Sequence, residues 1–306
     1  MSDSTHALFG VNLFGDPVQP PSRGPVADAF VEPPFTVLDA RSGEWQDRKR
    51  AWASMGIQGE VGRDAPSIHC PTSSNKGGMD DANYVSIFDP VICELAYRWF
   101  CPDGGQVIDP FAGGSVRGIV AGALGREYWG CDLRAEQIAA NEAQADTIGV
   151  TPRPAWVTGD SRDTMAVAPE ADLVFTCPPY GDLERYSDDE ADLSAMDWSG
   201  FMFAYRLILH RAVARLKPNR FACVVVGNFR DTKTGLYRDL VGETVVGMSE
   251  AGLGYYNEAV LVTSVGSASM RVTKQFNAGR KLCKTHQNVL VFVKGDWRKA
   301  AEACRG

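Results

Sequence analysis

The chain has 306 residues, of which 44% are hydrophobic and 23% charged, a composition typical of a soluble globular protein with a sizeable core. No stretch approaches the roughly 20 apolar residues of a membrane span, and the N-terminus lacks the basic segment and apolar run of a signal peptide. We therefore expect a cytoplasmic protein with no membrane partner. The formal net charge of −7 gives no general support for nucleic-acid binding, although a local basic face would still permit it. The eight cysteines include no Cys-x-x-Cys pair, which argues against a zinc ribbon and a disulfide framework, so no metal is expected.

The first 80 residues differ from the rest of the chain. Residues 1–34 are rich in proline and carry little apolar periodicity, and we interpret them as an extended or partly disordered arm. Residues 35–80 are interpreted as an N-terminal extension that packs on the core, because Trp45 and Trp52 have the spacing of one helix face. Within this extension, residues 56–80 are rich in Gly, Ser, Asp and Pro and indicate a long loop.

Residues 81–298 alternate between strand and helix patterns. Helices are predicted over residues 90–100, 114–125, 134–149, 198–217 and 240–252. Strands are predicted over residues 106–109, 127–133, 155–160, 172–177, 221–228, 258–265 and 288–295. This alternation predicts an α/β domain with a mostly parallel seven-stranded sheet and helices on both faces. The last two strands lie close in sequence and are expected to form an antiparallel hairpin at one edge.

The turns after the first three strands have the chemistry of a nucleoside site. The first turn, Asp109-Pro-Phe-Ala-Gly-Gly-Ser115, lets backbone approach a ligand, yet it is neither a Walker loop nor Gly-x-Gly-x-x-Gly. Its aspartate and phenylalanine suit a cationic ligand better than a pyrophosphate. Asp132 ends the second strand, where a carboxylate can accept from both ribose hydroxyls. Asp160 follows the third strand and is a candidate acceptor for an adenine amino group.

The ordered motifs VIDPFAGGS, GCDL, GDS and TCPPY resemble those of class I S-adenosylmethionine-dependent methyltransferases. The similarity is greatest to DNA base methyltransferases, including the N4-cytosine/N6-adenine group. Three further stretches resemble a phage-type branch of that group: PPFTVLDARSGEWQDRKRAW, FDPVICELAYRWF and GRKLCKTHQNVLVFVKGD. The resemblance covers most of residues 33–296. It implies a Rossmann-like fold, S-adenosyl-L-methionine as cofactor, double-stranded DNA as partner, and a phage-encoded enzyme acting in a bacterial host.

The resemblance also implies which residues contact the cofactor. Asp109 and the turn that follows would hold the methionine group, Asp132 the ribose and Asp160 the adenine ring. Helix capping is the alternative role for both Asp132 and Asp160, and core packing is the alternative for Phe111. The expected cofactor-binding residues are Phe88, Asp89, Pro90, Asp109, Pro110, Phe111, Ala112, Gly113, Gly114, Ser115, Asp132, Leu133, Asp160 and Ser161.

The motif after the fourth strand, Cys177-Pro178-Pro179-Tyr180, indicates how a base is bound and attacked. Tyr180 would stack on a base flipped out of the duplex. Amino-methylating enzymes carry Asp, Asn or Ser where this chain has Cys177, and a thiol is a weak hydrogen-bond acceptor. A cysteine suits C5 methylation of cytosine better, because a thiolate that adds to C6 makes C5 nucleophilic. The C5 family usually has Pro-Cys at this place, so the chain departs from both patterns.

C5 chemistry also needs an acid near N3 and O2 of the base, which the C5 family takes from a Glu-Asn-Val segment. This chain has Asn228 and Arg230 at the equivalent place, both candidate base contacts, but no glutamate. Glu184 or Asp182 are candidate substitutes. We favour C5 methylation over N4 or N6 methylation. An inert Cys177, an RNA methyltransferase and a non-catalytic nucleic-acid-binding module are the alternatives.

Residues 264–286 form the most basic segment and are predicted to be a DNA-contacting loop. The segment contains no acidic residue, and it lies between the last two predicted strands. The candidate phosphate contacts in it are Arg271, Lys274, Arg280, Lys281 and Lys284. A second, smaller basic cluster, Arg48-Lys49-Arg50, is expected to assist.

Overall fold

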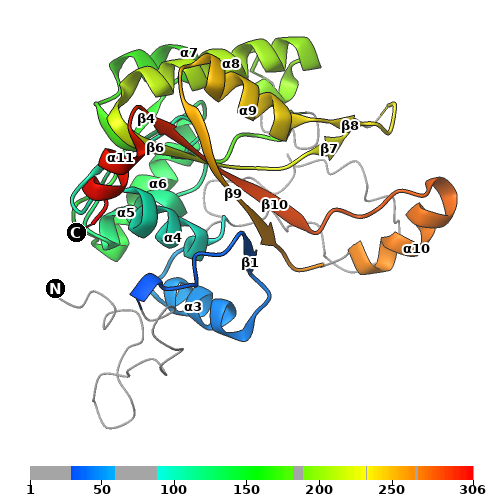
Figure 1. Ribbon diagram of the computed structural model, residues 1–306, viewed down its shortest axis with the longest axis horizontal. Coiled ribbons are helices and arrows are strands. Elements are labelled where there is room, and N and C mark those ends of the chain that lie inside the picture. The colour runs from blue at the N-terminus through cyan, green and yellow to red at the C-terminus, as the bar shows by residue number, and fades with distance from the viewer. Residues whose placement is uncertain (1–28, 59–87, 182–188, 232, 266–267, 306) are drawn as a thin grey trace, which may run out of the picture.

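The computed structural model describes residues 29–58, 88–181, 189–231, 233–265 and 268–305, and an eight-stranded sheet runs through it (Figure 1). The sheet order is β1-β9-β10-β6-β5-β2-β3-β4. β10 is antiparallel to both neighbours, whereas every other pair within this sheet is parallel. The strands are β1 (Val37–Asp39), β2 (Gln106–Asp109), β3 (Glu127–Asp132), β4 (Ala155–Thr158), β5 (Ala171–Thr176), β6 (Leu216–Val226), β9 (Gly254–Val262) and β10 (His286–Lys294).

This topology confirms the predicted Rossmann-like α/β fold with a mostly parallel sheet, with one addition. β1 from the N-terminal extension pairs in parallel with β9, so the sheet has eight strands rather than seven. The predicted antiparallel pair, β9 and β10, is present. Because β1 covers β9, this pair lies one strand inside the edge where it was expected.

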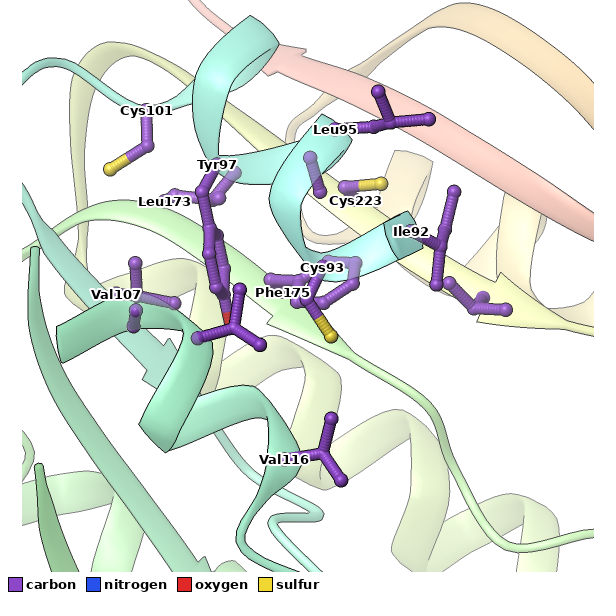
Figure 2. Close-up of a cluster of buried hydrophobic side chains, with 14 of the residues drawn as sticks. Ile92, Cys93, Leu95, Tyr97, Cys101, Val107, Val116, Leu173, Phe175 and Cys223 are labelled. Atoms are coloured by element: carbon purple, nitrogen blue, oxygen red, sulfur yellow. The ribbon is translucent and has the colours of Figure 1, made fainter. Parts of the chain in front are cut away.

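Helices cover both faces of the sheet, as the alternating pattern predicted. Along β5, Leu173 and Phe175 point into one hydrophobic cluster while Val174 points into the other. Figure 2 shows the first cluster, where Tyr97 packs edge-to-face on Phe175 with ring centroids 5.3 Å apart. Helices α4 (Pro90–Phe100), α5 (Val116–Ala123), α6 (Ala135–Ile148) and α11 (Trp297–Ala303) lie on that face, and α7 (Ser161–Thr164), α8 (Trp198–Arg215) and α9 (Leu240–Glu250) on the other. Among the described residues, no helix is long and apolar enough to cross a membrane.

The described part of the N-terminal extension packs on the core through helix α3 (Gly43–Ser54). Trp45 and Trp52 are each 1% exposed, which confirms the prediction from their spacing. Between them, the buried Arg48 pairs with the buried Glu94 of α4. Arg48 is therefore unavailable to DNA, contrary to the prediction, because its charge neutralises a buried carboxylate. The predicted arm up to residue 28 and the predicted loop over residues 59–80 lie outside the described residues.

Two small structures extend beyond the sheet on the same side of the molecule (Figure 1). One is the hairpin of β7 (Phe229–Arg230) and β8 (Tyr237–Arg238). The other is helix α10 (Ala268–Gly279), which occupies most of the basic segment between β9 and β10. The basic segment was predicted to be a loop, so its helix is a correction.

Candidate active site

A cavity of about 340 Å³ lies at the carboxyl ends of the central parallel strands. Ligands of open α/β sheets bind at this edge, because the strand ends bring the connecting turns together there. The turns after β2, β3, β4 and β5 all contribute to its wall, and α3 closes one side. The cavity therefore collects residues that were predicted as cofactor contacts and residues that were predicted as catalytic.

Asp132, at the end of β3, lies on the cavity wall with its carboxylate fixed by backbone. One oxygen accepts from the N–H of Gly113 at 3.0 Å and the other from the N–H of Arg134 at 3.0 Å. Burial raises the pKa of Asp132 despite these hydrogen bonds. Each oxygen keeps a further lone pair, so the carboxylate is positioned to accept from hydroxyl groups of a ligand.

Asp160, after β4, lines the cavity and also caps helix α7. It accepts from the N–H of Arg162 at 2.8 Å and from Nε of the same residue at 2.8 Å. Burial opposes ionisation of Asp160, but the hydrogen bonds from Arg162 outweigh it, so the pKa is lowered. Asp160 therefore caps the helix, as the alternative predicted, and also lines the cavity. Gly159 before it has φ of +154°, and a Cβ there would approach Thr164 to 2.6 Å.

Asp109 does not line the cavity, which corrects its predicted role as a methionine contact. It is fully buried, and its oxygens accept from Thr176 Oγ1 at 2.6 Å, Tyr128 OH at 2.8 Å and Arg117 Nε at 2.5 Å. Its hydrogen-bonding capacity is directed inward, so Asp109 shapes the turn rather than contacting a ligand. Three other predicted contacts are buried and absent from the cavity wall: Pro90, Ala112 and Ser115.

Arg117 is the buried ion-pair partner of Asp109, and it was not singled out from the sequence. Its guanidinium donates to the carbonyl oxygens of Phe111 and of Ala112, the latter at 2.9 Å, and lies 4.6 Å from the Phe88 ring centroid. Burial alone would lower the pKa of Arg117, but the carboxylate of Asp109 raises it well above the ordinary value. Arg117 lines the cavity and fixes the glycine turn at its base. A single charge in the otherwise apolar segment VRGIVAGA was the available signal, since a buried charge needs a partner.

The predicted cofactor residues that do line the cavity are Phe88, Asp89, Pro110, Phe111, Gly113, Gly114, Asp132, Leu133, Asp160 and Ser161. Ser161 donates to the carbonyl of Pro110 at 2.5 Å, which joins the turns after β2 and β4. The wall also contains Ile92, Val116 and Arg134, which the motifs did not indicate.

Cys177, Pro178, Pro179 and Tyr180 lie on the wall of the same cavity as Asp132. Tyr180 OH accepts from Gln287 Nε2 at 2.6 Å, and its ring lies edge-to-face on Phe229 at 6.4 Å. The orientation of the tyrosine ring is thus fixed from two sides. Gln287, on β10, was not singled out from the sequence.

Cys177 differs from the core cysteines. Burial raises the pKa of the Cys223 thiol to about 12 and that of Cys131 to about 11, which keeps both protonated. Cys177 is half-buried on the cavity wall, and its sulfur interacts electrostatically with the Arg117 guanidinium.

The acids predicted to act on the base, Glu184 and Asp182, lie outside the described residues. A third acid from the same stretch, Asp192, is buried on the cavity wall. Its carboxylate accepts from the Ser194 N–H at 2.8 Å and hydroxyl at 2.7 Å, which holds it in place. Asp192 was not distinguished from its acidic neighbours in the sequence.

Asn228 and Arg230 do not line the cavity, contrary to the prediction that they contact the base. The Asn228 amide donates to Asp239 at 2.8 Å and accepts from the Val241 N–H at 2.8 Å, so it organises the start of α9. The Arg230 guanidinium donates to the Gly235 carbonyl at 3.0 Å and lies over the Tyr237 ring within the small hairpin.

The predicted DNA contacts divide into two groups. Lys274, Arg280 and Lys281 are exposed on or after α10, and the side chain of Arg271 lies outside the description. Lys284 is half-buried, and burial lowers its pKa. A Cβ at Gly227 would lie 3.3 Å from Lys284 Nζ and 3.8 Å from Tyr180 Cε1, so Lys284 lies close to the tyrosine that faces the cavity.

Solved structures match this fold at low sequence identity. TrmN from Thermus thermophilus is 17% identical, with 68% of this chain and 49% of TrmN covered and a TM-score of 0.46, so the chain spans about half the length of TrmN. The [4+2]-cyclase SpnF is 13% identical over 68% of this chain and 82% of its own, with a TM-score of 0.48. A protein provisionally assigned as a DNA modification methylase, also from Thermus thermophilus, is 21% identical over 45% of this chain and 51% of its own, with a TM-score of 0.33. No family model and no curated protein matches the sequence.

Proposed function

We propose that the chain is an S-adenosylmethionine-dependent DNA methyltransferase that flips out cytosine and methylates C5 through Cys177. One observation carries the proposal: the thiol of Cys177 and the ring of Tyr180 line the same cavity as the carboxylates of Asp132 and Asp160. A methyl donor and a base bound there would meet at the cavity wall that carries the thiol.

The residues of the cavity fit S-adenosylmethionine. Asp132 offers lone pairs to ribose hydroxyls, and Asp160 offers lone pairs to an adenine amino group. Phe111 and Leu133 line the same cavity and provide apolar surface for a purine ring. Gly113, with φ of +49°, leaves open space over the turn, since a Cβ there would meet no atom closer than 4.0 Å.

The half of the cavity that carries Cys177 and Tyr180, called the base half below, fits a pyrimidine attacked by sulfur. Cys177 thiolate adds to C6, so an S–C6 bond forms and the C5=C6 electron pair moves to C5. When bound, the cofactor supplies the methyl group that C5 takes from its sulfonium sulfur. A base then removes the C5 proton, the double bond re-forms and the thiolate leaves. Asp192 is the candidate for this base, and Tyr180 holds the ring by stacking. Glu184 or Asp182 keeps the predicted role of the acid near N3 and O2.

DNA as the substrate is supported by the positive charge of the basic segment, residues 264–286. Lys274, Arg280 and Lys281 are exposed, and a Cβ at Gly235 of the small hairpin would lie 2.8 Å from Lys281 Nζ. Lys284 lies close to Tyr180. Phosphate contacts in this region would deliver a flipped nucleotide toward Cys177.

Amino methylation of cytosine or adenine is the second candidate, favoured by the Pro178-Pro179-Tyr180 frame. It requires an acceptor for the exocyclic amine where this chain has a thiol, which accepts weakly. For this reason we rank it below C5 methylation.

The products distinguish these candidates. Double-stranded DNA and an RNA control are incubated with isotope-labelled S-adenosylmethionine, digested to nucleosides and analysed by mass spectrometry. We expect label in 5-methyldeoxycytidine only. Label in N4-methyldeoxycytidine or N6-methyldeoxyadenosine would replace the C5 assignment with amino methylation, and label in RNA alone would contradict the DNA substrate. No label in either, with no cofactor binding, would favour a non-catalytic module.

A further inference from the structure

Lys49 and Asp89 form an ion pair on the cavity wall beside helix α3. Lys49 Nζ lies 3.3 Å from Asp89 Oδ2, and both residues line the cavity. The Lys49 side chain is 38% exposed and that of Asp89 is 15% exposed, so the pair is accessible to a ligand from the cavity side. The sequence had grouped Lys49 with Arg48 and Arg50 as a DNA contact.

Both members of the pair are held in place by neighbouring structure. Asp89 caps α4 by accepting from the Val91 N–H at 3.0 Å, and it accepts from Trp45 Nε1 at 3.1 Å. Helix α3, which carries Lys49, is fixed to α4 by the buried pair of Arg48 and Glu94. The cap of α4 and the position of α3 therefore place the ion pair at the cavity wall, with the Lys49 side chain partly exposed.

An ion pair presents complementary charge to both ends of an amino acid. A ligand carboxylate can bind a lysine ammonium, which has three donors, and a ligand ammonium can bind the remaining lone pairs of a carboxylate. On this side of the cavity, the other residues from α3 and its approach are Ala40 and Gln46, which are uncharged. The nearby Arg117 already donates to Asp109 and to the carbonyls of the glycine turn.

We propose that Lys49 binds the carboxylate of the methionine group of the cofactor and that Asp89 binds its ammonium. The inference rests on S-adenosylmethionine being the cofactor and adds a specific residue of the N-terminal extension to its site. It gives the cofactor a direction, with the amino acid toward α3 and the nucleoside toward Asp132 and Asp160. The extension is then part of the cofactor site, and Lys49 is not a DNA contact.

Truncated ligands test this assignment by binding alone. S-Adenosylhomocysteine carries the amino-acid group, whereas 5′-methylthioadenosine lacks both its carboxylate and its ammonium. Calorimetry measures the affinity of each for the full chain and for Lys49→Met, Lys49→Arg and the control Arg50→Met. Arg50 lies on the same helix, exposed and paired with Asp47.

We expect Lys49→Met to weaken the binding of S-adenosylhomocysteine by about tenfold and to leave the binding of 5′-methylthioadenosine unchanged. Lys49→Arg should retain most of the affinity, and Arg50→Met all of it. Unchanged binding of 5′-methylthioadenosine also shows that the variant is folded. An equal effect on both ligands, or none, would overturn the assignment, as would a loss of DNA affinity in Lys49→Met without loss of S-adenosylhomocysteine. If the unaltered chain binds neither ligand, the proposed function itself fails.

Discussion

The two halves of the cavity are built in different ways. In the half that we propose for the cofactor, which carries Asp132 and Asp160 and is called the cofactor half, backbone N–H groups hold Asp132. The buried pair of Asp109 and Arg117 fixes the glycine turn there. In the base half, Tyr180 is held by two side chains, Gln287 and Phe229, that come from distant strands. The acidic stretch that follows Tyr180 is described only from residue 189 onward.

This difference separates binding from specificity. A site built from strand-end turns and backbone contacts is set by the fold and tolerates few changes. A site held by side chains from distant parts of the chain can change its substrate while the sheet stays the same. We therefore expect the cofactor half to respond to mutation through ligand affinity or stability, and the base half through catalysis.

Removal of the Cys177 sulfur gives the largest expected effect and would separate the two halves. Cys177→Ser should lower methylation at least about a thousandfold, because the nucleophile that we propose for the activation of C5 is lost. Affinity for S-adenosylhomocysteine, measured by calorimetry, should not change. Cys304→Ser, at another half-buried thiol, is the matched control and should keep its activity. A Cys177→Ser variant that methylates DNA at the normal rate would contradict sulfur attack.

Removal of Arg117 tests whether the cofactor half depends on its buried ion pair. Arg117→Met should lower the free energy of unfolding by about 3–5 kcal/mol, because the Asp109 carboxylate is left buried without its cation. Arg153→Met breaks an exposed pair with Asp146 and should cost about 0–1 kcal/mol. Urea denaturation measures both. Equal losses in the two variants would show that the buried pair does not stabilise the turn.

Substitution of Asp132 should change the affinity for the cofactor product. Asp132→Ala should weaken S-adenosylhomocysteine about tenfold or more, because hydrogen bonds between the ribose hydroxyls and a charged acceptor are lost. Asp163→Ala, at a carboxylate that is 86% exposed, should bind as the unaltered chain does. Calorimetry provides the measurement, and DNA affinity should be the same in both variants. Unchanged affinity in Asp132→Ala would move the ribose away from this carboxylate.

Tyr180 tests the base half by binding rather than by chemistry. Tyr180→Ala should weaken the binding of DNA by about fivefold or more, because base stacking contributes about 1–3 kcal/mol to binding. Tyr180→Phe keeps the ring but loses the hydrogen bond from Gln287, so its effect should be smaller. Fluorescence anisotropy with labelled duplex measures both. An alanine variant that binds as tightly as phenylalanine would exclude stacking.

The smallest expected effect concerns how α3 is held against the cofactor half. Burial opposes ionisation of Glu94, but hydrogen bonds and charge from Arg48 outweigh it and lower the pKa. A lowered pKa contributes stability that is present above the ordinary value and is lost as pH falls through the value in the fold. Unfolding free energies between about pH 6 and about pH 3 should fall less steeply in Glu94→Gln than in the unaltered chain. The same pH dependence of the unfolding free energy in both chains would show that the ionised Glu94 does not stabilise the packing of α3.

Much of the fold and of the cofactor half follows from the sequence. Strand and helix periods predicted the sheet, and the rule that parallel strands end at one edge brought Asp132 and Asp160 to one cavity. The resemblance to methyltransferases assigned Asp109 to the methionine group, but a motif does not say which way a side chain points, and this carboxylate faces the core.

The base half was less predictable because its contacts join distant parts of the chain. Gln287 reaches Tyr180 from β10, and Asp192 returns to the cavity from an acidic stretch in which no residue stands out. Asn228 and Arg230 follow β6 as expected, yet they are used to build α9 and the small hairpin. Local pattern carries no information on such long-range pairings.

Covalent trapping tests the central claim most directly. DNA that contains 5-fluorocytosine cannot lose a proton from C5, so an adduct formed by sulfur attack and methyl transfer should persist. We predict a protein–DNA adduct only when S-adenosylmethionine is present, with the modified peptide mapping to Cys177 and no adduct in Cys177→Ser. An unaltered chain that methylates ordinary DNA but forms no adduct with the fluorinated duplex would contradict covalent catalysis by Cys177.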